Sequence, residues 1–128
     1  MEKLTFDSGL RTYRVGGGTL RFNPSDPNLY ARFLDALDRL AQLEQTLDTP
    51  REASGIIALL SDTDKQVKDI LRQVFGPEND LEAVFGGMNL LAVGDNGMRL
   101  LTNFMAALEP ILTDGARRCA RAEAEKLK

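Results

Sequence analysis

The sequence contains no histidine and no tryptophan, and its only cysteine is Cys119. The missing histidine removes the commonest general base and a leading metal ligand. A single cysteine excludes an internal disulfide framework and fits a reducing compartment. We therefore expect a protein without catalytic residues, metal site or cofactor, and we interpret Cys119 as a passive thiol.

An excess of basic charge is also missing. The net charge is −3 and the isoelectric point is near 5.0, whereas a nucleic-acid-binding domain usually carries a basic patch. No apolar run approaches the roughly 20 residues that cross a bilayer. The first residues, MEKLTFDSG, lack the apolar centre of a secretory signal. We expect a cytoplasmic protein that binds neither nucleic acid nor membrane.

Motifs that carry chemistry are absent as well. The run Gly16-Gly17-Gly18 is not followed by Gly-Lys-Ser/Thr and a helix, as a phosphate loop requires. The acidic pairs Asp35/Asp38 and Asp62/Asp64 fall in predicted helices, where solvated helix faces explain both pairs better than acid–base catalysis does. The sequence therefore predicts a protein that is not an enzyme.

The residues that are present predict one folded domain. The chain has 128 residues, of which 43% are hydrophobic, enough to build a core. We predict an α+β domain, mainly helical, over residues 1–115, with an N-terminal antiparallel β-hairpin or meander followed by three to four helices. Residues 116–128 are polar helix-formers with little to bury, and we predict a helical tail that is either solvated or a docking arm.

Residues 3–23 show the pattern of β-structure. Leu4 and Phe6 alternate with polar residues, and the segments LRTYRV (10–15) and TLRF (19–22) follow between glycine-rich turns. Alternation with a period of two, bounded by such turns, is typical of a small antiparallel meander. Glycines 16–18 can adopt positive φ without steric cost, as a tight hairpin requires.

Two long helices are predicted next, over residues 27–47 and 50–75. Asp26 followed by Pro27 is typical of a helix start, and Thr49 to Glu52 reads as a capping box. The pattern weakens at residues 61–64, where Thr63 or Asp64 takes a core-facing position, but we favour one unbroken helix. The apolar stripe of the first helix consists of Tyr30, Phe33, Leu34, Leu37, Leu40, Ala41 and Leu47.

The remaining helices are predicted over residues 79–85 and 98–115. Gly76 and Pro77 end the long helix before them, and a turn rich in Pro, Asn and Asp follows. The Asn96-Gly97 step allows a second interpretation, a hairpin between residues 90–93 and 98–101. Helical spacing after residue 101 favours the helix, which Pro110 should kink or interrupt.

Apolar residues with several methionines gather around the two Phe-Gly steps. Methionine is flexible and is common on surfaces that accept varied partners. These residues either close the core or form a partner-binding patch, and we name them as candidates: Phe75, Phe85, Met88, Leu90, Leu91, Met98, Phe104 and Met105. The apolar run from Phe85 to Val93 also predicts self-association, because the helical stripes before it already supply a core.

Three segments resemble small tail assembly chaperones of phages and prophages of Gram-positive bacteria. They are LRFNPSDPNLYARFLDAL (20–37), KDILRQVFGPENDLEAVFGGMN (68–89) and FMAALEPIL (104–112), and together they span most of the chain. The positions that match are mostly capping and core residues, which we interpret as fold-determining: Pro24, Asp26, Pro27, Phe33, Phe75, Gly76, Phe85 and Gly86.

The resemblance implies a non-enzymatic protein that acts while a long phage tail is assembled. Proteins of this kind are thought to bind the tape measure protein, the tail tube protein or both, and to keep exposed helices from aggregating. An acidic helical chain without chemical motifs suits that role. Two alternatives stay open: a structural component of the virion or of the head–tail joint, or another helical adaptor. A small-molecule enzyme would need a pocket with convergent polar groups.

Overall fold

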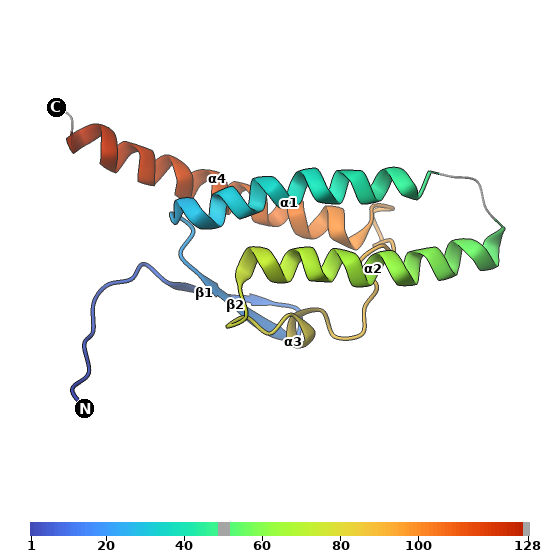
Figure 1. Cartoon of the computed structure of the whole chain (residues 1–128), viewed down its shortest axis with the longest axis horizontal. Helices are drawn as coiled ribbons and strands as arrows, with labels where there is room; N and C mark the ends of the chain where they lie inside the picture. The colour runs from blue at the N-terminus through green and yellow to red at the C-terminus, as the bar shows by residue number, and fades with distance from the viewer. Residues whose placement is uncertain (49–51, 127–128) are drawn as a thin grey trace.

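The computed structural model of the chain describes residues 1–48 and 52–126. Within these residues it contains β1 (Arg11–Val15), β2 (Gly18–Phe22), α1 (Pro27–Thr46), α2 (Ala53–Phe75), α3 (Leu81–Phe85) and α4 (Leu100–Lys126). Figure 1 shows α1 and α2 side by side in opposite directions, with α4 against α1 and the hairpin at one side of the helices. The predicted class, mainly helical α+β with an N-terminal hairpin, is confirmed.

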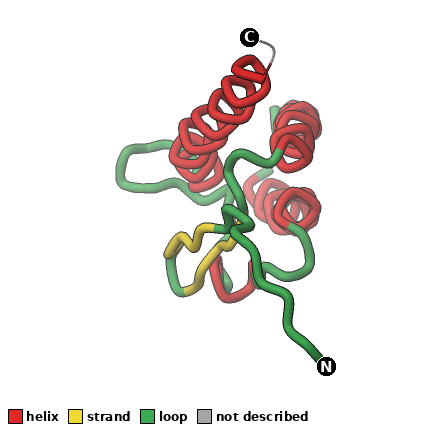
Figure 2. The backbone as a smooth tube through the Cα atoms, turned by 90° about the vertical axis from the view of Figure 1, so that its left-hand side faces the viewer, coloured by secondary structure: helices red, strands yellow, loops and turns green. Residues whose placement is uncertain are grey.

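The strands β1 and β2 form a two-stranded antiparallel hairpin. Arg11 lies opposite Phe22 at its open end, and Val15 lies opposite Gly18 next to the turn. Leu20 and Phe22 are buried because alternate residues of β2 face the helices. The hairpin and α3 lie together below the three long helices in the end view (Figure 2). The small sheet therefore covers one side of the helical layer.

Glycines at the tip of the hairpin allow it to touch the backbone of α3. Gly16 has a φ of +56°, in the region that side chains disfavour. A Cβ atom at Gly16 would lie 2.5 Å from the carbonyl oxygen of Val84, and one at Gly18 would lie 2.8 Å from the carbonyl carbon of Ala83. The Gly-Gly-Gly run thus serves both the turn and the close approach of two backbones.

The first ten residues are not β-structure, so the predicted meander is wrong over residues 3–10. They form an exposed extended arm that leaves the body of the molecule. The root of the arm is held by Asn23, whose Nδ2 donates to the carbonyl oxygen of Ser8 at 3.1 Å. Leu4 and Phe6 therefore alternate as in a strand but pair with no strand in the described chain.

The helices α1 and α2 follow the prediction closely. The Asp26 carboxylate caps α1 by accepting a hydrogen bond from the backbone N–H of Asn28 at 2.9 Å. The helix α2 continues without a break through residues 61–64, as expected, and both Thr63 and Asp64 are buried. Residues 49–51 of the predicted capping box lie outside the described residues, and Glu52 makes no side-chain cap.

Asp64 is not on a solvated face, which corrects the interpretation made from the sequence. Its Oδ1 accepts a hydrogen bond from the backbone N–H of Leu90 at 2.8 Å, and its Oδ2 lies 2.9 Å from Nζ of Lys68. Lys68 also donates to the carbonyl oxygen of Met88 at 2.7 Å. The carboxylate is buried between α2 and the loop after α3, and its hydrogen bond fixes this loop to the helix. Asp62 is exposed, as predicted.

The corner between α2 and α3 is built on Gly76 and Asn79. Gly76 has a φ of +88° and ends α2, as the Phe-Gly step predicted. Buried Asn79 donates to the carbonyl oxygens of Phe75 and Arg21 and accepts from the backbone N–H of Arg21. Asp80 then caps the short helix α3. Asn79 therefore joins the end of α2 to the outer edge of β2.

The segment before α4 contains features of both structures considered for it. Val93 and Arg99 form an isolated antiparallel bridge, and the backbone N–H of Leu100 donates to the carbonyl oxygen of Ala92 at 2.8 Å. The helix then starts at Leu100, two residues after the predicted start. It continues through Pro110, where the missing hydrogen bond falls on the exposed side of α4.

The middle of α4 packs against the turn that precedes α1. A Cβ atom at Gly115 would lie 1.9 Å from the carbonyl oxygen of Pro24, and Pro24 is itself fully buried. Beyond this contact α4 continues to Lys126, and residues 120–126 are exposed. The predicted tail is therefore the last part of one continuous helix, which extends past the other elements (Figure 1).

Candidate partner-binding site

Four of the eight candidate partner-binding residues are buried in the core: Phe75, Phe85, Leu90 and Leu91. The ring of Phe104 packs against two of them, with centroids 6.3 Å from Phe75 and 5.2 Å from Phe85. These side chains close the core, which is the alternative that the sequence left open. They offer no surface to a partner in this structure.

The same burial removes the argument for self-association from the run between Phe85 and Val93. Of its large apolar side chains, only Met88 and Val93 are exposed. The others are held inward because the loop is fixed to α2, in part by Asn89, whose Nδ2 donates to the carbonyl oxygen of Leu60. The buried residues of this run, Phe85, Leu90 and Leu91, therefore offer no surface to a second copy in this structure.

The other four candidates do not form one patch. Met88 and Met98 are about half exposed, near the two ends of the loop between α3 and α4. Phe104 and Met105 are partly buried neighbours on α4 that line different hollows. Phe104 lies under the hairpin, and Met105 lies between α4 and α1. Only Met105 is part of the groove described next.

A groove of about 310 Å³ runs between α1 and α4. Its apolar lining consists of Leu37, Leu40 and Ala41 from α1 and Leu101, Met105 and Ala106 from α4. Leu40 and Leu101 are buried and form its floor, whereas Leu37 is exposed. Glu44 and Glu109 are the charged residues of the lining, and both are acidic. We call this feature the α1–α4 groove.

The groove has an apolar wall because the apolar residues of α1 extend beyond the face of the helix that packs in the core. The residues of α1 that are buried are Leu29, Phe33, Ala36 and Leu40. Leu34, Leu37 and Ala41 lie beside that stripe, at the same three- and four-residue spacing, and remain exposed. The sequence predicted one apolar stripe that included these three residues. The stripe is in fact wide enough to occupy two adjacent faces of α1, and only one of them is packed. The width of the stripe was the signal in the sequence for an open apolar face.

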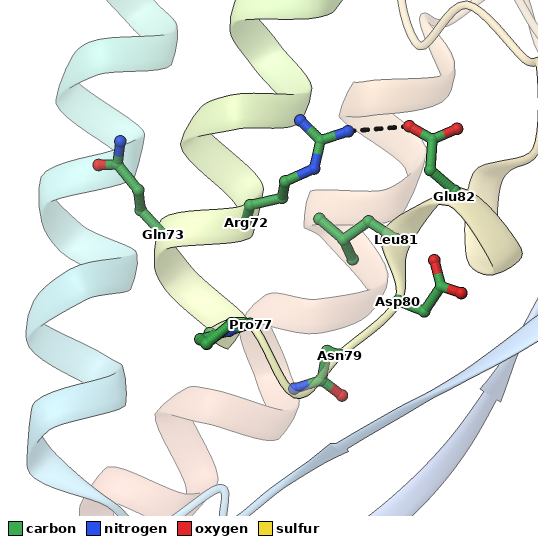
Figure 3. A pocket seen from close by; sticks show the side chains of 8 residues that line it. Arg72, Gln73, Pro77, Asn79, Asp80, Leu81 and Glu82 are labelled. Atoms are coloured by element: carbon green, nitrogen blue, oxygen red, sulfur yellow. Dashed lines mark hydrogen bonds and ion pairs between the residues drawn. The ribbon is translucent and has the colours of Figure 1, made fainter.

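A second hollow, about 580 Å³, lies at the corner between α2 and α3 (Figure 3). Arg72 extends over it and pairs with Glu82 at 2.8 Å and with Asp69 at 2.5 Å. The guanidinium group is thus bonded to carboxylates of its own chain. Buried Leu81 and Asn79 close the inner wall. The corner is explained by the packing of α3 on α2.

In residues 1–48 and 52–126, no three His, Cys, Asp or Glu side chains are placed to hold one metal ion. No helix in these ranges is both long enough and apolar enough to cross a bilayer. Cys119 is a free, partly buried thiol on α4.

No protein-family model matches the chain, and no solved structure gives a significant match. The features of the chain that bear on its function are therefore the residues of the α1–α4 groove and the three segments that resemble tail assembly chaperones.

Proposed function

We propose that this protein is a non-enzymatic chaperone of phage tail assembly that holds an amphipathic helix of its partner in the α1–α4 groove. The observation that carries the proposal is the second apolar face of α1, where Leu34, Leu37 and Ala41 are exposed and the last two line the groove together with Met105. An exposed apolar strip bordered by charges is typical of a surface that binds another protein.

The shape and chemistry of the groove favour a helix as the bound element. Two helices form its walls, and an amphipathic helix can place residues at i, i+3, i+4 and i+7 into such a channel. Met105 can adapt to side chains of different shape. Glu44 and Glu109 favour a partner with basic residues beside its apolar stripe.

The resemblance supplies the proposed partner. A tape measure protein is long and helical, and a tail tube protein exposes assembly surfaces before it polymerises, so both need protection while the tail is built. The proposed place of action is the host cytoplasm. An acidic surface, with a net charge of −3, suits a helper that must stay dispersed while it holds apolar segments.

The test is affinity capture of the tagged chain from its native host during phage or prophage induction, with mass spectrometry of the bound proteins. We expect a long helical tape measure protein or a tail tube subunit. Recovery only within mature particles would favour a structural virion component instead. A purified sample that carries a bound metabolite and captures no protein would contradict the chaperone function.

A pair of variants locates the site. Leu37→Asp puts a charge into the α1–α4 groove and should weaken partner binding about tenfold or more, because an apolar contact is replaced by a desolvated carboxylate. Ile57→Asp makes the same change at an exposed residue of α2 outside the groove and should leave binding unchanged. Equal capture by the two variants, with thermal melting confirming that both fold, would place the site elsewhere.

A further inference from the structure

The two edges of the hairpin differ in how their backbone groups are satisfied. In a hairpin with a two-residue turn, the pair next to the turn is hydrogen-bonded, and bonded pairs then alternate along the strands. With Val15 opposite Gly18, the backbone groups of Arg21 must therefore point outward from β2. Asn79 binds both of these groups. Its Oδ1 accepts a hydrogen bond from the N–H of Arg21 at 2.7 Å, and its Nδ2 donates one to the carbonyl oxygen of Arg21 at 3.1 Å. The β2 edge is thus covered.

The opposite edge, along β1, is open. By the same alternation, the N–H and C=O groups of Thr12 and Arg14 point outward from β1. Within residues 1–48 and 52–126, neither strand pairing nor the backbone bonds between elements supply them with a partner. A free edge of this kind accepts an extended segment as an additional strand.

A groove lies beside this open edge, between β1 and α4. Two adjoining hollows, of about 900 and 240 Å³, share Tyr13 and Ile111 in their linings. The α4 side of the groove includes Ala106 and Ala107, whose small side chains leave room above the helix. A strand added to β1 would face these alanines with every second side chain.

The N-terminal arm has the side-chain pattern that such a strand needs. Leu4 and Phe6 alternate with polar residues, and they are 90% and 78% exposed. They are among the most exposed large apolar side chains of the chain. Figures 1 and 2 show the arm extending away from the rest of the molecule. The chain therefore carries an unpaired apolar strand pattern and an unoccupied strand position.

The arm is directed away from the open edge of its own hairpin. Asn23, which follows β2, donates to the carbonyl oxygen of Ser8, and a Cβ atom at Gly9 would lie 2.7 Å from Nδ2 of Asn23. This contact holds the root of the arm on the β2 side, whereas the free edge is on the other side of β1. A second copy can place its arm there without disturbing the contact.

We propose that residues 3–7 of a second copy bind along β1 as a third strand, with Leu4 and Phe6 in the groove against α4. The exchange is reciprocal, so two copies satisfy each other's edges and the assembly closes as a dimer. The groove carries a net charge of +2, from the four arginines Arg11, Arg14, Arg117 and Arg118 and the two carboxylates Glu109 and Asp114, while residues 3–7 carry one charge of each sign, Lys3 and Asp7. The strand pattern of the arm, and not its charge, therefore identifies it as the occupant.

Light scattering on the full chain tests the dimer, and it does so independently of the proposed partner. We expect twice the chain mass of 14.1 kDa. The double variant Leu4→Asp/Phe6→Asp should fall to the mass of one chain with unchanged circular dichroism, because the arm is outside the folded body. The matched control Leu34→Asp/Leu37→Asp alters the exposed face of α1 and should stay dimeric. A monomeric unmodified chain, or loss of the dimer only in the control, would overturn the proposal.

A disulfide trap tests the geometry. In a Cys119→Ser background, a chain with Phe6→Cys is co-expressed with a differently tagged chain with Ala107→Cys, and the product is oxidised. We expect a covalent species that contains both tags, and at least tenfold less of it when Ala107→Cys is replaced by Gln66→Cys, an exposed site on α2. Equal trapping at both sites overturns the proposal. So does a chain carrying both Phe6→Cys and Ala107→Cys that closes its disulfide only within itself.

Discussion

At the residue scale, the fold depends on a few small or polar residues that let backbones meet. Asn79 bonds both backbone groups of Arg21 and also the end of α2. Gly16 and Gly18 let the hairpin tip touch α3. Gly115 does the same for α4 and the Pro24 turn. Each of these residues brings together segments that are distant in the sequence, so none is replaceable by a residue of similar polarity alone.

Gly115→Ala should destabilise the protein, although alanine is the better helix-former. The helical preference is worth up to about 1 kcal/mol, but the added Cβ would lie 1.9 Å from the carbonyl oxygen of Pro24. We expect a net loss of about 2 kcal/mol in the free energy of unfolding, measured by urea denaturation. Gly87→Ala is the control, because no atom lies within 4 Å of its added Cβ. A Gly115→Ala variant as stable as the unmodified chain would contradict this contact.

At the element scale, α2 organises the segment that joins α3 to α4. Leu60, Asp64 and Lys68 lie one helical turn apart on α2, and each makes a polar contact to residues 88–90. Because these contacts repeat every four residues, they fix the loop along one face of the helix. Leu90 and Leu91 are thereby held in the core, and the start of α4 is placed beside α1.

Asp64→Ala should therefore loosen this loop, whereas Asp62→Ala should not. Removing the Asp64 carboxylate leaves the N–H of Leu90 without its acceptor, and it leaves the largely buried Lys68 ammonium with the carbonyl oxygen of Met88 but without its anion. We expect a loss of about 3 kcal/mol in unfolding free energy and faster hydrogen exchange at Leu90. Asp62 is exposed on the same helix, so the Asp62→Ala substitution should lower the unfolding free energy by less than about 0.5 kcal/mol. Similar effects of the two variants would refute the anchoring role of Asp64.

At the scale of the whole molecule, one hydrophobic cluster joins β2, α1, α2, α3 and α4. The exposed features outside it include the N-terminal arm, the second apolar face of α1 and the end of α4. The first two carry large apolar side chains, and the third is polar. Interaction with other molecules is therefore expected at the arm and at α1, while the end of α4 contributes little to stability.

A truncation series tests this division of the chain. A protein ending at Cys119 should keep its free energy of unfolding within about 0.5 kcal/mol, because the described residues that it loses, 120–126, are all exposed. A protein ending at Pro110 also loses fully buried Leu112 and the Gly115 contact, and should lose about 3 kcal/mol or more. Denaturant melts of both chains decide the matter. A large loss in the longer chain would mean that the end of α4 packs on the body.

Much of the fold was predictable from local patterns. Asp26-Pro27 marked the start of α1, Phe75-Gly76-Pro77 marked the end of α2, and the glycine run marked the hairpin turn. These patterns are reliable because capping and positive φ depend on a residue and its immediate neighbours. The candidate site was less predictable. The sequence shows that Leu37 and Phe85 are both apolar, but it does not show which of the two the other elements cover.

The sequence by itself determined the mainly helical composition, the turns and the ends of most elements, because hydrogen bonds within a few residues decide them. Only the tertiary structure decided which apolar residues are core, that Asp64 is buried, and that Leu4 and Phe6 stay unpaired. Burial depends on what packs from elsewhere in the chain. An alternating segment becomes a strand only when an edge is within reach, and Asn23 directs this one away from the free edge of β1.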